Sequence, residues 1–281
     1  MHNHPCFLIA VLVLIFGSPS LLSQTTISAP TNSDVLIITS TGSTDSNLTI
    51  SEDVSGNYTI TDPSNALTAG SNAVQVDANT VTVASNFVTL RVDVNLDNVT
   101  SGDQITAVGL SLPLTVISRN LTILGVTSSS DFTSRSQKVT ISGPITATGT
   151  VRFTDDGFSG IELGPKDGTA NTLELTDAEL DLVTASQLVI GPTTNGPITF
   201  EGSISLDKSK VPSISLVTEQ GIIDSNTGID LTASFIAVTA RTGIGDGSFL
   251  EFDAGEAEGE GLSVTVSDPA PGDQSGGVWI Q

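Results

Sequence analysis

The residues of this chain that could do chemistry are almost all carboxylates. Both histidines, His2 and His4, and the single cysteine, Cys6, lie within the first six residues, whereas Asp and Glu number 31. We expect that N-terminal segment to be removed on export, so nucleophilic catalysis by a Ser/His/Asp or Cys/His set is excluded for the remaining chain. A zinc site there would need carboxylate ligands alone, which is uncommon.

Asp155 and Asp156 form the best candidate pair for acid–base chemistry. Two carboxylates can cleave a glycosidic bond when one protonates the leaving group and the other activates water. A carbohydrate-active enzyme that uses only Asp and Glu is therefore the alternative function. Gly157 follows directly, however, and Asp-Gly dipeptides stabilise turns through side-chain hydrogen bonds and permissive backbone angles. A turn is the simpler interpretation.

The segment from Asp93 to Asp97 matches the first half of a calcium loop. The match fails further on, because Asn98 stands where glycine is required and Gln104 where a bidentate Glu belongs. We interpret Asp93 as part of the polar face of a strand whose intervening apolar residues point inward.

Two other groups of acids are weaker candidates. Asp177, Glu179 and Asp181 straddle a reversal of the pattern at Leu180, so they need not share a face. An exposed acidic loop at 255–261 could gather Ca²⁺ weakly; it contains Glu256, Glu258 and Glu260. The sequence therefore predicts no catalytic residue, no cofactor and no dedicated metal site.

The charge of the chain narrows its partners. The formal net charge is −22, from 31 acidic and 9 basic residues. Such a field repels nucleic acids, anionic lipids and polyanionic glycans, and acidic side chains keep a surface soluble. Nine scattered Lys and Arg also suit poorly the lyases that must neutralise the carboxylates of an acidic polysaccharide. We expect no nucleic-acid partner, and the identity of a cell-surface, glycan or protein partner stays open.

The N-terminus is typical of an export signal. Residues 7–16 are an apolar run of ten residues that ends at Gly17-Ser18-Pro19. Ten residues are too few to cross a bilayer. Cleavage after Ser20 or Ser23 would suit the small-residue preference, so we take 1–23 as the signal peptide. The sequence thus predicts a secreted or cell-surface protein without a transmembrane span.

Short strands closed by Gly, Asn, Asp or Pro recur along the rest of the chain. Examples are Leu121 to Ile123, Val139 to Ile141, Ile198 to Phe200 and Ile229 to Leu231, and apolar and polar residues alternate through most such runs. Strand starts are expected near 139, 145, 151, 161, 173, 180, 188, 198, 204, 214, 229 and 236, so three successive steps add up to between 22 and 32 residues. That stride suits a coil of three short strands.

The predicted fold is therefore all-β, a right-handed parallel β-helix (solenoid). At roughly 27 residues per coil the exported chain would make about ten short coils, and stacking would join their apolar interiors into one core. A β-sandwich remains the alternative, because several Asn-Gly and Asp-Gly dipeptides could close hairpins. The expected interior residues are Leu121, Ile123, Val139, Ile141, Leu173, Leu175, Ile214 and Leu216.

Several segments in the second part of the chain resemble a known family. They are 120–125, 198–206, 242–246 and 261–266, and the resemblance extends over 120–281. These segments resemble the repetitive parallel β-helix regions of large bacterial surface adhesins, the filamentous-haemagglutinin-like and autotransporter-passenger group. Membership would imply a secreted or surface-exposed right-handed β-helix with an adhesive or structural role, and it would carry over no catalytic residue.

The expected organisation has a less regular β region at 24–118, which would supply a cap and the first coils, and a β-helix repeat region at 119–281. The last residues, from Ser275, look like the opening of another coil. Either Trp279 caps the stack or the chain is a fragment of a longer protein. The predicted function is a non-catalytic adhesive or structural module at the cell surface.

Overall fold

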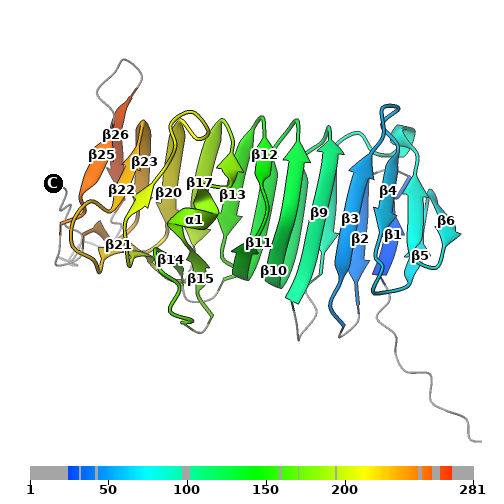
Figure 1. The fold of residues 1–281 in the computed structure, drawn as a ribbon, viewed down its shortest axis with the longest axis horizontal. Helices are drawn as coiled ribbons and strands as arrows, with labels where there is room; N and C mark the ends of the chain where they lie inside the picture. The colour runs from blue at the N-terminus through cyan, green and yellow to red at the C-terminus, as the bar shows by residue number, and fades with distance from the viewer. Residues whose placement is uncertain are drawn as a thin grey trace, which may run out of the picture.

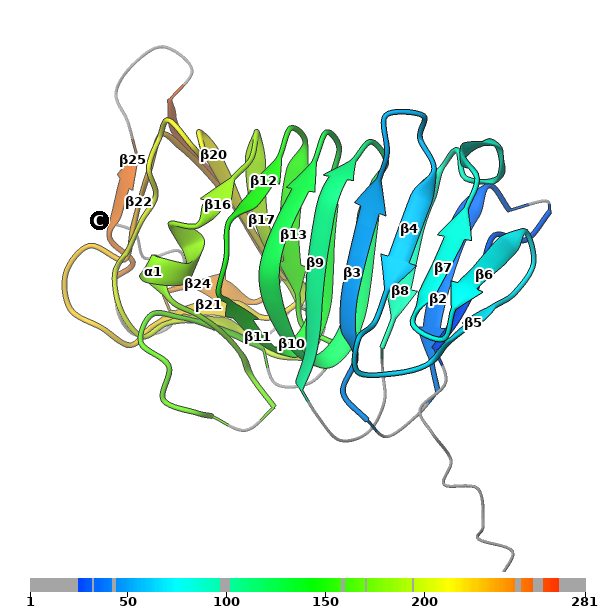
Figure 2. The same ribbon diagram turned by 45° about the vertical axis from the view of Figure 1, so that its right-hand side comes forward.

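The computed structural model describes residues 25–31, 33–41, 44–96, 102–157, 160–169, 171–193, 195–245, 249–254 and 260–267. The expected signal peptide at 1–23 and Trp279 lie outside these residues. Within them the regular secondary structure is almost entirely β-strand, as the alternating pattern predicts. The strands stand side by side in one elongated row (Figure 1), with β1 to β7 toward one end and β25 and β26 toward the other. A turned view shows the same order along the row (Figure 2).

The longest ladder of strands is parallel at every step from β2 to β26. From β8 onward, paired residues lie between 18 residues apart in the sequence (Leu114 with Phe132) and 37 apart (Val151 with Leu188). Parallel neighbours need such long connections because the chain must return to the same end before it pairs again. In spatial order the strands are β2 (Val35–Ser40), β8 (Arg91–Asn95), β10 (Leu114–Ser128), β11 (Phe132–Ile141), β13 (Thr150–Thr154), β17 (Gln187–Thr193), β20 (Ser213–Thr218), β23 (Phe235–Ala240) and β26 (Gly261–Val266).

Three shorter parallel ladders accompany the long one. The second joins β3 (Asn47–Glu52), β9 (Gly102–Leu110), the later parts of β10 and β11, β12 (Ile145–Ala147) and β16 (Val183–Thr184). The third joins β15 (Leu173–Leu175), β14 (Ile161–Leu163), β18 (Ile198–Phe200), β21 (Gly221–Asp224) and β24 (Gly243–Ile244). The fourth joins β19 (Ile204–Ser205), β22 (Leu231–Ala233) and β25 (Phe252–Ala254).

The N-terminal end of the row is built differently, from antiparallel pairs. Strand β3 pairs with β4, β4 with β7 and β7 with β6, while β1 pairs antiparallel with β2 and parallel with β5. These strands are β1 (Thr25–Ser28), β4 (Tyr58–Thr61), β5 (Leu67–Ala69), β6 (Ala73–Asp77) and β7 (Thr80–Val83), and a single 3₁₀ turn, η1 (Ser85–Phe87), follows them. Hairpins of this kind need only short connections.

The core runs the length of the row and consists mainly of Leu, Ile and Val. All eight side chains expected in the interior are at most 4% exposed, which confirms the predicted facing of those strands. The core contains few rings, and some of these pack against each other. Phe200 on β18 and Phe252 on β25 meet edge to face with ring centroids 6.3 Å apart. Stacked strands thus share one apolar interior, and burial of that interior is the main force that holds them together.

The prediction of a strand that begins near residue 180 is wrong. The segment forms one turn of α-helix, α1 (Asp177–Leu180). Thr176 Oγ1 accepts a hydrogen bond from the backbone N–H of Glu179, and the backbone N–H of Thr176 donates to the Glu179 carboxylate in return. This reciprocal pair is a capping box, a motif typical of helix N-termini in which Ser or Thr precedes Glu by three residues.

Candidate functional site

Two groups of three carboxylates are the chemically distinctive features of the described residues. In each group every residue offers one oxygen, and the three oxygens lie within 4.8 Å of one another. Glu162, Asp167 and Glu174 form the β14–β15 cluster. Asp224, Asp230 and Glu251 form the C-terminal cluster. Like charges at such distances repel, so each arrangement needs a physical explanation.

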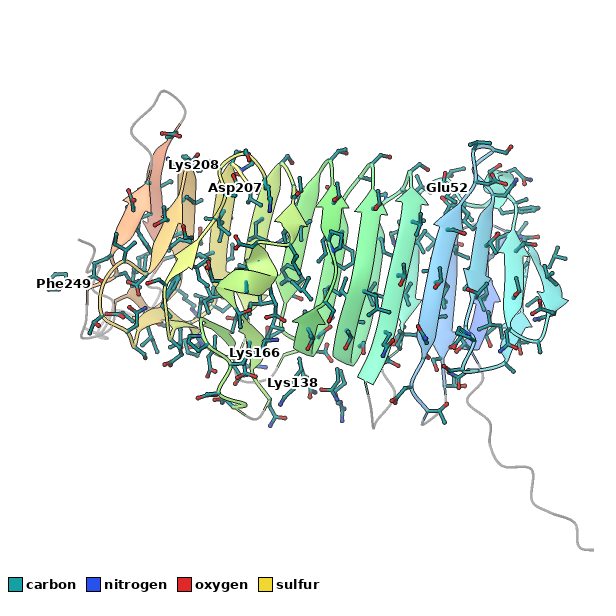
Figure 3. The ribbon with its side chains drawn as sticks, viewed as in Figure 1. Glu52, Lys138, Lys166, Asp207, Lys208 and Phe249 are labelled. Atoms are coloured by element: carbon teal, nitrogen blue, oxygen red, sulfur yellow. The ribbon has the colours of Figure 1, made fainter. Side chains whose placement is uncertain are left out.

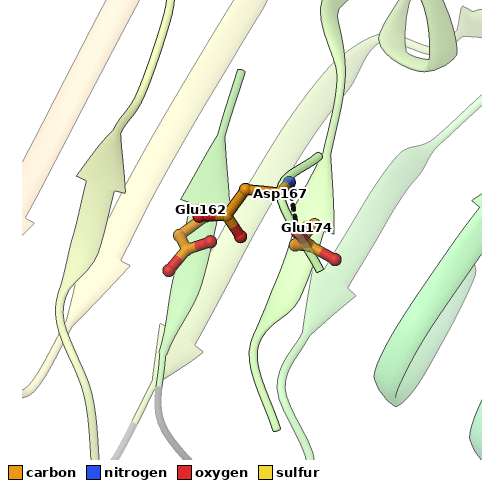
Figure 4. A group of neighbouring side chains, drawn as sticks. All are labelled: Glu162, Asp167 and Glu174. Atoms are coloured by element: carbon orange, nitrogen blue, oxygen red, sulfur yellow. Dashed lines mark hydrogen bonds between the residues drawn. The ribbon is translucent and has the colours of Figure 1, made fainter. Parts of the chain in front are cut away.

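The β14–β15 cluster is largely explained by its own loop. Glu162 and Glu174 are direct partners on adjacent strands, and Asp167 lies in the connection between those strands (Figure 4). Glu174 Oε1 accepts hydrogen bonds from the backbone N–H groups of Asp167 at 2.9 Å and Gly168 at 2.7 Å. Asp167 Oδ1 accepts from the N–H and the hydroxyl of Thr169. These bonds fold the connection back onto the strand edge.

The electrostatics of this cluster separate its members. Partial burial, followed by repulsion from Asp167 and Glu174, raises the pKa of Glu162 above its ordinary value. The hydrogen bonds from Thr169 lower the pKa of Asp167. Glu162 and Asp167 could share a proton. The hydrogen-bond donors around Asp167 and Glu174, however, already give those two carboxylates a structural role.

The C-terminal cluster gathers residues from three separate segments. Asp224 ends β21, Asp230 directly precedes β22, and Glu251 directly precedes β25. Asp230 is fully buried, and its Oδ2 accepts a hydrogen bond from the backbone N–H of Glu251 at 2.8 Å. Asn226 bridges the other two acids, since its side chain donates to Asp230 Oδ1 and its backbone N–H donates to Asp224 Oδ1.

Burial dominates the electrostatics of the C-terminal cluster. It raises the pKa of Asp230 to about 7, and repulsion from Asp224 and Glu251 adds to the effect, while the hydrogen bond from the Glu251 backbone opposes it. The alternating strand pattern did not indicate that Asp230 is buried. Ile229 and Leu231 were both expected in one strand with Asp230 between them, but β22 begins at Leu231, Ile229 is 49% exposed and Asp230 points inward.

The best sequence candidates, Asp155 and Asp156, lie just after β13. Asp155 is buried, whereas Asp156 forms an ion pair with Arg135 at 2.8 Å. Gly157 has φ of +84°, a left-handed conformation that suits the expected turn. Asp155 and Gly157 nevertheless line a hollow of about 250 Å³ together with Arg135, Thr154 and Pro192.

The other acidic candidates have structural environments. Asp93 lies on the outer face of β8 and pairs with Arg91 at 2.8 Å, as expected for the polar side of a strand; Asp97 and Asn98 lie outside the described residues. Asp177 Oδ1 accepts from the N–H of Ser205 at 2.7 Å. In the acidic loop, Glu256 and Glu258 also lie outside the described residues, and Glu260 lies 3.6 Å from Lys208 Nζ.

Glu179 holds the short helix against the second ladder. Its Oε1 accepts hydrogen bonds from the backbone N–H of Ile141 at 3.0 Å and from Lys166 Nζ at 2.7 Å. Lys166 also donates to the backbone carbonyl of Val139, and Figure 3 shows it near Lys138 at the edge of the row. Asp177 and Glu179 therefore have separate partners and do not form one site.

No family model, curated protein or solved structure matches the chain. Over the described residues, no helix has the length and apolar character that a membrane crossing requires.

Proposed function

We propose that the protein is an exported right-handed parallel β-helix of about ten short coils that acts as an adhesive or structural module at the cell surface. The observation that carries this proposal is the unbroken parallel ladder from β2 to β26 above one continuous apolar core. Repetition of one strand pairing makes a long lateral surface from a short repeat, which suits attachment and spacing better than enclosure of a substrate.

The outer face of this ladder supports a binding role. One side chain from each strand falls on a single row, at intervals of about 4.8 Å. From β8 to β26 the row is Asp93, Thr115, Thr133, Arg152, Val189, Ser215, Ala237 and Ser263. Most of these side chains are short, and all but Val189 are at least partly exposed. Such a regular, mostly polar row could meet a repeating partner.

The β2–β8–β10 end of that face also carries a hollow of about 470 Å³. Arg91, Asp93, Asn95 and Thr115 supply its polar groups, while Ile37 and Ile117 supply apolar surface. Binding sites for small ligands commonly combine apolar walls with a few polar groups that fix orientation. We place the adhesive contact on this face.

The decisive experiment measures adhesion of purified protein to cell surfaces and to neutral glycans. A Thr115→Lys, Thr133→Lys variant changes two neighbouring positions of the outer row. Thr122→Lys, Thr140→Lys is the matched control, because it makes the same changes on the same two strands, β10 and β11, but on the second ladder. We expect adhesion to fall in the first variant and to persist in the control. Equal adhesion by both variants contradicts the assignment to this face.

The alternative, a carbohydrate-active enzyme, rests on the hollow beside Asp155. We expect no turnover of neutral polysaccharides. If turnover occurs and disappears in an Asp155→Asn, Asp156→Asn variant that keeps its β-sheet circular dichroism, the enzyme replaces the adhesive module. Binding without turnover, unchanged in that variant, supports the module.

A further inference from the structure

We propose that Asp224, Asp230 and Glu251 bind a calcium ion at the C-terminal end of the row of strands. The proposal concerns a site that the sequence pattern does not predict, and it holds whether or not the protein is adhesive. Three carboxylates from three separate segments converge there, with one oxygen of each within 4.8 Å of the others. Calcium takes oxygen ligands at 2.3–2.6 Å, so oxygens gathered this closely can reach a common ion.

A second observation concerns Glu251 alone. Its Oε2 is completely buried and has no hydrogen-bond partner. The rest of the side chain is only partly exposed. A buried carboxylate oxygen without a donor costs free energy, and a bound water or ion would satisfy it. Glu251 is one of the three residues whose carboxylates converge in the C-terminal cluster.

The surrounding charges do not balance the cluster. The ion pairs of the described residues are Arg91–Asp93, Arg135–Asp156, Lys166–Glu179 and Lys208–Glu260, and none includes a member of the C-terminal cluster. Asn226 contributes hydrogen bonds to two of the acids but no positive charge. A divalent cation supplies the charge that these neighbours lack.

Comparison with the β14–β15 cluster explains why we choose only one site. There, backbone N–H groups of Asp167 and Gly168 converge on Glu174, and Thr169 satisfies Asp167. In the C-terminal cluster the Oε2 of Glu251 has no such donor. The two groups have similar spacing, so hydrogen bonding and not the number of acids distinguishes them.

The ligand chemistry selects calcium. Three carboxylates without a sulfur or imidazole ligand favour a hard cation over zinc or copper. Calcium accepts irregular coordination by six to eight oxygens, whereas magnesium demands a near-ideal octahedron and keeps several of its waters. Glu251 can offer both oxygens, and water can complete the coordination shell on its exposed side.

The experiment titrates CaCl₂ into metal-free protein by isothermal calorimetry and follows the thermal midpoint in parallel. The test variant is Glu251→Gln, which keeps the size of a partly exposed side chain. Asp253→Asn is the matched control: it also removes one carboxylate, two residues away, but from an exposed position on β25. Asp224→Asn serves as a second test variant.

We expect one saturable calcium site in the wild-type protein and in Asp253→Asn, with a higher thermal midpoint when calcium is bound. Glu251→Gln and Asp224→Asn should weaken that affinity by at least about tenfold, the lower end of the losses caused by changes around metal sites. MgCl₂ should give a clearly smaller thermal shift.

Three results would overturn the proposal. The first is a wild-type protein without a saturable calcium site. The second is a Glu251→Gln affinity within twofold of the Asp253→Asn value. The third is an equal response to magnesium, which would reject calcium as the cation. Native mass spectrometry of the wild-type protein counts bound calcium directly, so the first result can be reached even if a test variant does not fold.

Discussion

Phe132 and Phe153 pack edge to face on adjacent parallel strands, with ring centroids 6.4 Å apart and ring planes at 79°. Both side chains are fully buried. Aromatic pairs prefer this geometry because the positive edge of one ring meets the negative face of the other. The pair ties β11 to β13 at the middle of the long ladder, before the longest excursion between its strands from β8 onward.

Truncation of one ring of this pair should lower the stability of the protein. We expect Phe153→Ala to lower the free energy of unfolding by about 3–5 kcal/mol, because it leaves a cavity in the buried core. Val54→Ala is the control, since Val54 is fully exposed; it should change stability by less than about 0.5 kcal/mol. Urea denaturation followed by circular dichroism measures both. Equal midpoints for the two variants would contradict a continuous packed interior.

Glu179 gives a second test, because it is a buried acid with several donors. Glu179→Gln places an amide NH₂ among the donors that now face the carboxylate, and it removes the negative charge that pairs with Lys166. We expect a loss of about 1–3 kcal/mol in unfolding free energy. Glu201→Gln removes an exposed carboxylate and should be nearly neutral. If both substitutions have the same small effect, Glu179 does not anchor α1.

The raised pKa of Asp103 predicts that the stability of the protein depends on pH. Its carboxylate is buried and accepts hydrogen bonds from the Ser46 N–H and the Ser118 hydroxyl, yet burial outweighs them and raises its pKa above the ordinary 3.8. The folded protein therefore holds this proton at pH values where the unfolded chain has released it. The stabilising contribution is complete below 3.8 and is lost as pH rises through the higher, folded value.

Asp103→Asn removes that titration while keeping the side-chain shape. We expect the variant to gain stability relative to wild type as pH rises from about 4 to about 8. Urea midpoints at several pH values measure the difference. Ser46 and Ser118 can still bond to the amide, so a variant that loses stability uniformly at all pH values would show that the hydrogen bonds matter more than the proton.

Alanine substitutions at Gly157 and Gly102 distinguish backbone strain from steric crowding. A Cβ at Gly157 would have its nearest neighbour at 3.8 Å, and one at Gly102 would have nothing within 4 Å, so neither is crowded. Only Gly157 has a positive φ, +84°. Gly157→Ala should cost about 1–2 kcal/mol, whereas Gly102→Ala should be neutral or stabilising. Thermal unfolding distinguishes these outcomes, and equal effects would contradict a strained turn after Asp156.

The sequence pattern predicted the positions of the strands better than it predicted which acidic residues come together. Leu173 and Leu175 alternate cleanly and point inward, because burial of one face determines the facing of a strand. The turn of helix at Asp177–Leu180 was missed although Thr176 and Glu179 carry its capping signal, since the apolar alternation around Leu180 competed with it.

Asp230 shows why the C-terminal cluster could not be predicted. Alternation places Ile229 and Leu231 on the same face, but a strand that starts at Leu231 leaves Ile229 free to point outward. Asp224 and Asp230 lie six residues apart, but Glu251 joins them only because β25 pairs with β22, 21 residues further along the chain. Local periodicity carries no information about such contacts.

The number of residues between paired strands of the long ladder varies, and this variation has a practical consequence. Val151 and Leu188 pair in register across 37 residues, and β14, β15 and α1 occupy the excursion between them, while Leu114 and Phe132 pair across only 18. The spacing along the row is thus set by hydrogen bonding and is independent of how much chain is looped out to the side. Loops within these excursions can lengthen or acquire new segments without disturbing the strands of the long ladder, so the protein is suited to serve as a scaffold that displays grafted peptides at regular intervals.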